Sequence, residues 1–166
     1  MRRAPFPKFR HKSQNTSRVF SADHMANQNQ TIQVLSEQIE KQKVLSGYLL
    51  SGPDAERRIA IAKDFARALN CEENRRFQEC DCKSCGKIES GNHPDVHWYG
   101  IDEDAASFKI ETVREFQNWL ALNPYEGLTK VLIFNKAHRL TQEAQYALLK
   151  SLEEPPPETV LLLLSS

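Results

Sequence analysis

The segments KVLIFNKAHRL (residues 130–140), TQEAQYALLKSLEEPPPET (141–159) and VLLLLSS (160–166) decide the fold of this chain. The first and the third contain continuous apolar runs, which are typical of strands buried on both faces. The second has small and apolar residues along one helical face and ends at three prolines, which stop a helix. Strand, helix and strand in this order predict a parallel sheet with helices on both faces.

The same alternation runs through the rest of the chain. Strand-like apolar runs at residues 48–51 and 96–99 alternate with helical patterns at 32–39, 59–69 and 110–122. Strands that alternate with helices predict a domain of the α/β class. A doubly wound sheet normally continues with a further helix and strand, whereas this sequence stops directly after a strand. We therefore expect the C-terminal part of the fold to be missing.

The 166 residues carry 22 basic and 22 acidic side chains, so the formal net charge is zero. Six of the bases and one of the acids lie within residues 1–24, which leaves the remainder mildly acidic. An acidic body argues against a broad nucleic-acid-binding face that acts alone. No apolar run approaches the roughly 20 residues of a membrane span, and no secretory apolar region is present. We therefore expect a cytoplasmic protein without membrane contact.

Residues 1–30 are rich in Arg, Lys, Ser, Asn and Gln and lack any helical or strand period, so a disordered tail is predicted there. Residues 31–166 are then one partial domain. Three interpretations of the tail stay open: a solvated extension, an over-extended start with true initiation near Met25, and an organelle targeting peptide.

A degenerate phosphate loop follows the strand at residues 48–51. The loop G-x-x-x-x-G-K-[ST] binds phosphates through backbone N–H groups, a lysine and a hydroxyl that ligates Mg²⁺. Gly52 keeps the first glycine, but Arg57 replaces the second. Arg58 replaces the lysine, and Ile59 replaces the hydroxyl. We interpret the segment as an ordinary strand-to-helix turn, in which Arg58 could still contact an anion at the helix N-terminus.

The strand at residues 131–134 ends where nucleotide hydrolases hold two acids, one for Mg²⁺ and one that activates water. This chain has Asn135 and Lys136 there. A neutral amide ligates Mg²⁺ weakly, and a lysine cannot act as general base in a position that suits a carboxylate. Both halves of an ATPase site are thus replaced. No catalytic residue is expected, and His138 is interpreted as a structural or surface histidine.

All cysteines of the chain lie within one short segment: Cys71, Cys80, Cys82 and Cys85. Four thiolates so close together are typical of a structural zinc site with a complete tetrahedral shell. Disulfides and free thiols are the alternatives, and a cytoplasmic chain disfavours disulfides. Gly86 is expected to take a positive φ, so that backbone N–H groups point at the sulfurs. The sequence therefore predicts a small zinc module inserted at residues 71–86.

The tripeptide His93-Pro94-Asp95 contains groups that could form a metal ligand or a catalytic dyad. Pro94 instead favours an extended lead-in to the strand at residues 96–99, and that is our interpretation. The acidic residues 102–104 are interpreted as a solvated loop.

Several runs together resemble the AAA+ clamp-loader subunits of bacterial DNA polymerase III, over residues 32–166. Residues 47–53 (GYLLSGP) resemble the first strand and phosphate turn of that family, and residues 147–156 (ALLKSLEEPP) are the most specific run. Residues 91–96 (GNHPDV) and 110–115 (IETVRE) are more similar to the delta-prime type than to the gamma/tau motor type. The resemblance implies an AAA+ fold of the P-loop type.

The resemblance also implies a function. Clamp-loader subunits form a ring with gamma/tau and delta subunits that loads the sliding clamp on primer-template DNA, and delta-prime is the member whose nucleotide site is usually inert. Zn²⁺ on the four cysteines, no ATP hydrolysis and membership of a DNA-directed DNA polymerase holoenzyme, a nucleotidyltransferase complex, are implied in the same way. The family usually has two residues between its middle cysteines, where this chain has Asp81 alone.

Two alternative functions are kept. An ATP-hydrolysing gamma/tau-type subunit would have been supported by a Lys-Ser/Thr pair at positions 58 and 59 and by acids at 135 and 136. A stand-alone zinc-binding nucleic-acid module would need a basic face, which four acids near the cysteines dilute. The family's strand order 5-1-4-3-2 further implies that, without a fifth strand, the strand at 48–51 is an exposed edge and the chain is marginally stable alone.

Overall fold

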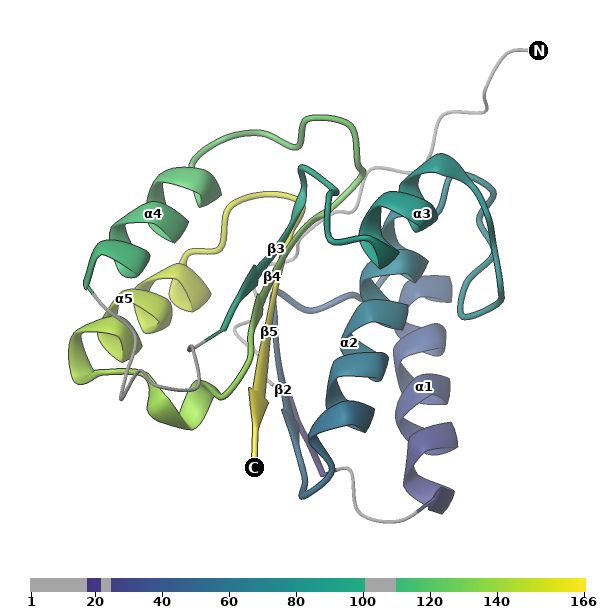
Figure 1. The fold of residues 1–166 in the computed structure, drawn as a ribbon, viewed down its shortest axis with the longest axis horizontal. Coiled ribbons are helices and arrows are strands. Elements are labelled where there is room, and N and C mark those ends of the chain that lie inside the picture. Colours follow the sequence, from purple (N-terminus) through teal and green to yellow (C-terminus); the bar gives the residue numbers. More distant parts are fainter. Residues whose placement is uncertain (1–17, 22–24, 101–109) are drawn as a thin grey trace.

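The computed structural model describes residues 18–21, 25–100 and 110–166, which form a five-stranded sheet with helices on both faces (Figure 1). The predicted α/β class is confirmed. In chain order the elements are β1 (Arg18–Ser21), α1 (Met25–Glu40), β2 (Gly47–Ser51), α2 (Ala55–Asn70), α3 (Lys83–Glu89), β3 (Val96–Tyr99), α4 (Ile110–Leu120), β4 (Lys130–Phe134), the 3-10 helix η1 (Ala137–Arg139), α5 (Gln142–Glu153) and β5 (Thr159–Ser165).

The strands follow the order β1-β2-β5-β4-β3, and all neighbouring strands are parallel. β5 lies in the middle, so Leu161 is opposite Gly47 on one side and Leu132 on the other. The carboxyl ends of parallel strands meet at one edge of a sheet. The turn after β2 and the residues after β4 therefore share that edge, two strand spacings or about 10 Å apart.

Each face of the sheet has its own apolar cluster. Val131 and Ile133 pack with residues of α1, α2 and α3, whereas Leu132 and Phe134 pack with residues of α4 and α5. Figure 1 shows these two helical layers on opposite sides of the strands. The continuous apolar run of β4 follows from this arrangement, because neither of its faces meets water. Burial of each such side chain contributes about 1.5–3 kcal/mol.

α5 packs closely on the sheet. Its N-cap is Thr141, whose hydroxyl accepts a hydrogen bond from the N–H of Ala144 at 3.3 Å. Ala144 is fully buried, and a Cβ at Gly47 of β2 would collide with the side chain of Leu152. Among the helices in the described part of the chain, none is long and apolar enough to cross a membrane.

The N-terminal part of the sheet differs from the prediction. β1 pairs in parallel with β2, with Arg18 opposite Tyr48 and Ser21 opposite Ser51. α1 begins at Met25, so a strand and the start of a helix lie within the tail that was expected to be disordered. The expected exposed edge at β2 is wrong for the same reason, because β1 pairs with the backbone groups that β2 would otherwise leave open. Residues 1–17 of the predicted tail, and the predicted acidic loop at 102–104, lie outside the described residues.

Candidate functional site

In the turn after β2, a carboxylate lies where a bound phosphate would need free backbone N–H groups. Asp54 is the N-cap of α2, and its side chain accepts a hydrogen bond from the N–H of Arg57 at 3.0 Å. The N–H of Gly52 donates to the carbonyl of Ser165 at 3.2 Å and so ties the turn to β5. A helix N-terminus binds an anion through its free N–H groups. Here an acid of the same chain already engages one of them, the N–H of Arg57.

Arg58 lies in the first turn of α2, next to the turn that follows β2. Arg58 is only 5% exposed, and its Nη1 donates to the carbonyl of Gly52. Its Nε is buried and has no hydrogen-bond partner among the described residues. The residue at the lysine position of a phosphate loop therefore points back at the loop and closes it.

The remaining substituted positions are also engaged in the fold. Ile59 packs against the apolar cluster that contains residues of α1, α2 and α3, and its side chain carries no oxygen that could ligate Mg²⁺. The N–H of Asn135 donates to the carbonyl of Tyr99 at 2.9 Å, which extends the β3–β4 pairing. Lys136 has a left-handed backbone with φ of 59° and precedes η1. Residues 135–140 contain no acidic side chain, so this segment supplies no carboxylate for Mg²⁺ or for activation of water.

A cavity of about 290 Å³ lies beside the same strand ends, and its walls are mostly apolar. Leucines of β2, β5 and α5 form these walls, together with Ala137 and Leu140, while His138, Gln145 and Ser165 supply the polar atoms. No carboxylate and no Lys or Arg is among the described residues that line it. Mg²⁺-bound phosphates need such groups, so the cavity does not resemble a nucleotide site.

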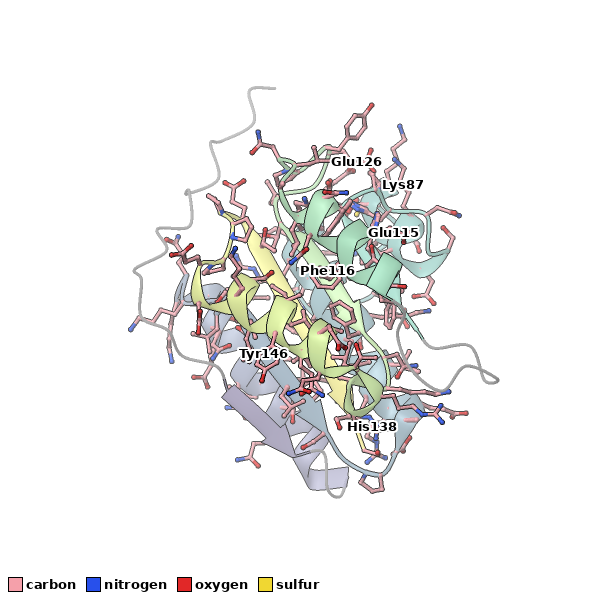
Figure 2. The ribbon with its side chains drawn as sticks, turned by 90° about the vertical axis from the view of Figure 1, so that its left-hand side faces the viewer. Lys87, Glu115, Phe116, Glu126, His138 and Tyr146 are labelled. Atoms are coloured by element: carbon pink, nitrogen blue, oxygen red, sulfur yellow. The ribbon has the colours of Figure 1, made fainter. Side chains whose placement is uncertain are left out.

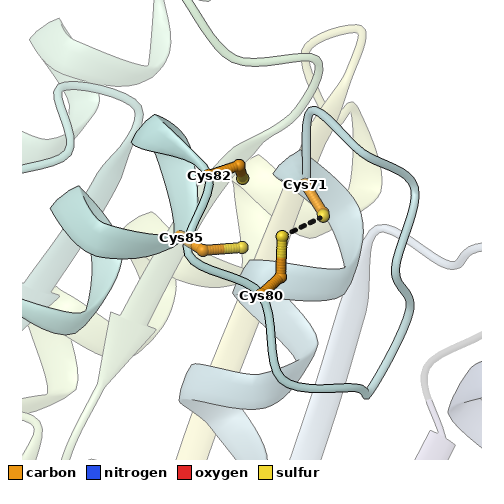
Figure 3. Close-up of side chains that lie close together, drawn as sticks. All are labelled: Cys71, Cys80, Cys82 and Cys85. Carbon is orange, nitrogen blue, oxygen red and sulfur yellow. Dashed lines mark hydrogen bonds between the residues drawn. The ribbon is translucent and has the colours of Figure 1, made fainter.

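All four cysteines come together at the other end of the sheet (Figure 3). Cys71 follows α2, Cys80 lies in the connecting loop, Cys82 is the N-cap of α3 and Cys85 lies within α3. Their sulfurs lie within 4.8 Å of one another, and those of Cys71 and Cys80 are 3.6 Å apart. Tetrahedral ZnS₄ with bonds of about 2.3 Å places its sulfurs about 3.8 Å apart, whereas a disulfide needs about 2.05 Å. The donor set and its spacing fit a tetrahedral metal ion.

Backbone N–H groups donate to the sulfurs of two of these cysteines, Cys71 and Cys82. The N–H of Arg75 donates to the sulfur of Cys71 at 3.3 Å. Burial opposes ionisation of Cys82, but the N–H groups of Cys85 and Glu72 bring its pKa down to about 7. Burial raises the pKa of Cys85. Since metals bind thiolates, Cys82 is the ligand best prepared for binding at neutral pH.

The backbone of the module differs from expectation at Gly86. This glycine does not have a positive φ; it lies within α3 and donates to the carbonyl of Cys82 at 3.0 Å. The first turn of α3 itself directs N–H groups toward Cys82, so a left-handed glycine is not needed. Asn74 and Phe77 are the described residues of the module with a left-handed backbone, with φ of 58° and 55°. The ring of Phe77 stacks on that of Phe65, with the ring centroids 6.3 Å apart. That contact joins the loop of the module to the core.

His93 is a buried structural residue of this region. Its Nδ1 accepts a hydrogen bond from the N–H of Asp95, and its Nε2 lies 3.1 Å from the hydroxyl of Ser84. Burial lowers the pKa of His93, which keeps the ring neutral at pH 7. A catalytic dyad would need Nδ1–H to donate to a carboxylate. Here Nδ1 accepts from a backbone N–H, and the geometry is that of a structural hydrogen bond.

Asp95 holds the loop between α4 and β4, which we call the 122–128 loop. Its buried carboxylate accepts hydrogen bonds from the N–H groups of Tyr125 (2.7 Å), Glu126 (2.8 Å) and Gly127 (2.6 Å). Burial alone would raise the pKa of Asp95, but these three bonds hold it below its ordinary value. The carboxylate is therefore a charged structural anchor.

Asn70, which directly precedes Cys71, holds the other end of the same loop. Its carbonyl oxygen accepts from the N–H groups of Leu128 and Thr129 at 2.9 and 3.0 Å, and its amide donates to the carbonyl of Thr129 at 2.9 Å. The loop carries exposed apolar side chains, with Leu122 65% and Tyr125 84% exposed. Figure 2 shows Glu126 of this loop beside Lys87 at one end of the molecule, and His138 at the opposite end.

The comparisons with known proteins agree with the fold. The family model for "DNA polymerase III, delta subunit" matches residues 27–166. The chain is 35% identical over 138 residues to the DNA polymerase III subunit tau/gamma of Haemophilus influenzae, across 82% of this chain and 20% of that protein. It is 31% identical over 139 residues to subunit delta' of Bacillus subtilis, across 83% of this chain and 41% of that protein.

A similar relation holds for subunit delta' of Pseudomonas aeruginosa, at 34% identity across 71% of this chain and 36% of that protein. The chain thus spans about two fifths or less of these relatives. Among solved structures, a DNA polymerase III gamma-subunit-related protein of Thermotoga maritima aligns with a TM-score of 0.58 at 24% identity, over 81% of this chain and 38% of that one. The expected AAA+ fold and the resemblance to the polymerase III clamp-loader subunits are confirmed. The chain belongs to the DNA polymerase III delta subunit family.

Proposed function

We propose that this protein is a delta-prime-type subunit of the bacterial DNA polymerase III clamp loader and helps to load the sliding clamp on DNA during replication. The family match and the delta' relatives support the assignment. Its partners are then gamma/tau and delta subunits in the bacterial cytoplasm, and it reaches the clamp and primer-template DNA through the complex. The nucleotidyltransferase activity of the holoenzyme lies in other subunits.

We infer further that this subunit does not hydrolyse ATP. The observation that carries the inference is the closed phosphate turn, in which Arg58 donates to the carbonyl of Gly52 and Asp54 engages the N–H of Arg57. Phosphoryl transfer needs a cradle of free N–H groups, a cation on the phosphates and a Mg²⁺ ligand. Here the N–H of Arg57 is engaged by the carboxylate of Asp54, and the cation of Arg58 by the carbonyl of Gly52.

An ATP-hydrolysing gamma/tau-type subunit is the second candidate, because the tau/gamma protein of Haemophilus influenzae is about as similar as the delta' relatives. Its chemistry would require a hydroxyl at Ile59 and acids at Asn135 and Lys136. The side chains present favour the delta-prime type.

We propose that the four cysteines hold one structural Zn²⁺. When bound, the ion would join the loop after α2 to α3 and contribute its binding free energy to folding. No catalytic role is assigned to it, because a shell of four thiolates leaves no open position for water or substrate.

ATP turnover by the purified chain tests the inference about nucleotide. We expect no turnover above that of the Arg58→Ala variant. Arg58→Lys should not create activity, since Ile59, Asn135 and Lys136 are still in place. Turnover by the natural sequence that Arg58→Ala abolishes would contradict the proposal.

The clamp-loader assignment has a separate test. Gamma/tau and delta subunits should form a complex with this protein in size-exclusion chromatography, and clamp loading should depend on its presence. Loading that is the same with and without the protein would show that the assignment is wrong, whatever the result of the ATPase measurement.

A further inference from the structure

We propose that the cysteine module is a metal-dependent anchor of the 122–128 loop, so that metal binding fixes the exposed side chains of Leu122 and Tyr125. This inference rests on the proposed zinc site, but not on the clamp-loader function. It starts from the finding that three polar connections join the module, which lies on one face of the sheet, to a loop whose residues are far away in sequence.

The first connection comes from the start of the module. Asn70 directly precedes the ligand Cys71 and is 3% exposed. Its side chain makes three hydrogen bonds of 2.9–3.0 Å to the backbone of Leu128 and Thr129. A metal bond at Cys71 restrains the backbone one residue away from this amide, and a shift of Asn70 would break all three bonds together.

The second and third connections come from α3, which carries two ligands. Ser84 lies between Cys82 and Cys85, and its hydroxyl is 3.1 Å from Nε2 of His93. Lys87 lies about half a helical turn after Cys85. Its Nζ lies 2.6 and 2.7 Å from the two carboxylate oxygens of Glu126. The ring of His93 in turn accepts from the N–H of Asp95, the main anchor of the loop.

The fit between loop and module is close at Gly127. A Cβ at this position would lie 2.6 Å from Oδ1 of Asn70, 3.1 Å from Oδ2 of Asp95 and 3.2 Å from Cε1 of His93. Only a glycine lets the backbone approach all three side chains at once. A partly enclosed cavity of about 150 Å³, lined by Cys71, Ser84, His93 and loop residues among others, lies between the two parts.

These contacts have a thermodynamic consequence. If metal binding favours the anchored conformation of the loop, then loosening the loop must weaken metal binding by the same factor. The module and the loop can therefore be tested from either side.

The first test measures amide hydrogen exchange of the chain with zinc bound and after chelation. The N–H groups of residues 125–129, which donate to Asp95 and Asn70, should exchange about tenfold faster or more without metal. The N–H of Gln145 in α5, which donates to Thr141, should change less than about twofold and is the internal control. Unchanged exchange at 125–129 in metal-free chain overturns the proposal, and so does equal acceleration throughout the chain, because the anchoring would then not be local.

The second test keeps the metal in place. The double variant Ser84→Ala/Lys87→Ala removes two connections and no sulfur, so it should retain one zinc per chain while exchange at residues 125–127 rises. Lys63→Ala is the matched control. Lys63 of α2 pairs at 3.1 Å with Glu89, which lies on α3 like Ser84 and Lys87, and this pair does not involve the loop. Protection at 125–127 equal to that of the control, with zinc bound in both, overturns the inference.

The third test starts from the loop. Gly127→Ala should release zinc to a competing chromophoric chelator at a chelator concentration at least about threefold lower than the natural sequence requires. Gly86→Ala, with open space around its Cβ, should not show this decrease. Equal zinc retention in the two variants overturns the coupling while leaving the zinc site intact. A chain that binds no zinc at all overturns both the proposed metal site and this inference, so metal analysis separates the two failures.

Discussion

The carboxylate of Asp95 lies 2.6 Å from the backbone nitrogen of Gly127, across 32 residues of sequence. The same carboxylate also accepts from two further N–H groups of the loop. Asp95→Ala would leave three N–H groups of a turn without partners, and we expect a loss of about 2–4 kcal/mol in the free energy of unfolding. Urea denaturation measures it. Asp64→Asn, which alters only a partly exposed pair with Arg67 at 3.7 Å, should cost less than about 1 kcal/mol.

The same residue predicts a dependence on pH. The pKa of Asp95 is lower in the folded chain than its ordinary value of about 3.9. Its stabilising contribution is therefore complete above about pH 4 and is lost as the pH falls through the folded-state pKa. The difference in unfolding free energy between the natural sequence and Asp95→Asn should shrink as the pH falls from about 4 to about 2, which is the side of the ordinary pKa on which the folded-state pKa lies. A difference that stays constant over this range would contradict the assigned charge state.

Asp54 predicts a helix-capping effect. Because its side chain accepts the N–H of Arg57 at the start of α2, Asp54→Ala should destabilise the chain by about 1 kcal/mol. Asp54→Asn should restore most of the loss, since an amide oxygen also caps a helix. If alanine and asparagine are equally destabilising in thermal denaturation, charge rather than capping is the cause.

Lys130 predicts an effect at the end of α4. Its buried amine donates to the carbonyls of Trp119 and Leu122 and lies 4.1 Å from the centroid of the Trp119 ring. Burial lowers the pKa of Lys130, so part of the gain offsets its own desolvation. Lys130→Met should nevertheless cost about 1–3 kcal/mol, because the carbonyls of Trp119 and Leu122 lose the amine that donates to them. Trp119 fluorescence during unfolding reports the change, and a variant as stable as the natural sequence would show that the bonds only offset desolvation.

Metal removal predicts a larger effect. Protein purified without chelator should contain one zinc per chain, and chelation should lower the midpoint of thermal unfolding, because binding free energy is lost from the folded state. Cys82→Ser should behave like the chelated chain. Four freely titratable thiols in the untreated protein, with no metal bound, would show that the site is a cluster of free cysteines.

Elements with long apolar or periodic patterns could be predicted from the sequence. The phosphate turn could be interpreted from the chemistry of the side chains that replace its glycine, lysine and hydroxyl. The runs in β4 and β5 are apolar at every position because both faces are covered, so their buried, parallel pairing followed directly. β1 was missed because four residues are too few to show a period of two, and its pairing with β2 is a tertiary contact.

The polar anchors could not be predicted for a related reason. Asn70 and Asp95 bond to residues 30 to 59 positions away, and no local pattern encodes such partners. The signals that exist are weak: an asparagine at a helix end beside a ligand cysteine, and a glycine in the turn at 123–127. Gly86 was given a left-handed backbone because glycine permits one, whereas the helix that follows Cys82 requires none.

The pairing of β1 with β2 predicts how a shorter protein that began at Met25 would behave. A protein that began at Met25 would keep α1 and every apolar cluster but would lack the strand that pairs with Gly47–Ser51. Its sheet would end in an open row of N–H and C=O groups beside Leu49 and Leu50, the kind of edge through which chains associate. Residues 25–166 should then self-associate as concentration rises in sedimentation experiments, while the longer form stays dispersed. In the longer form, the four backbone residues of β1 cover this edge and would oppose such association.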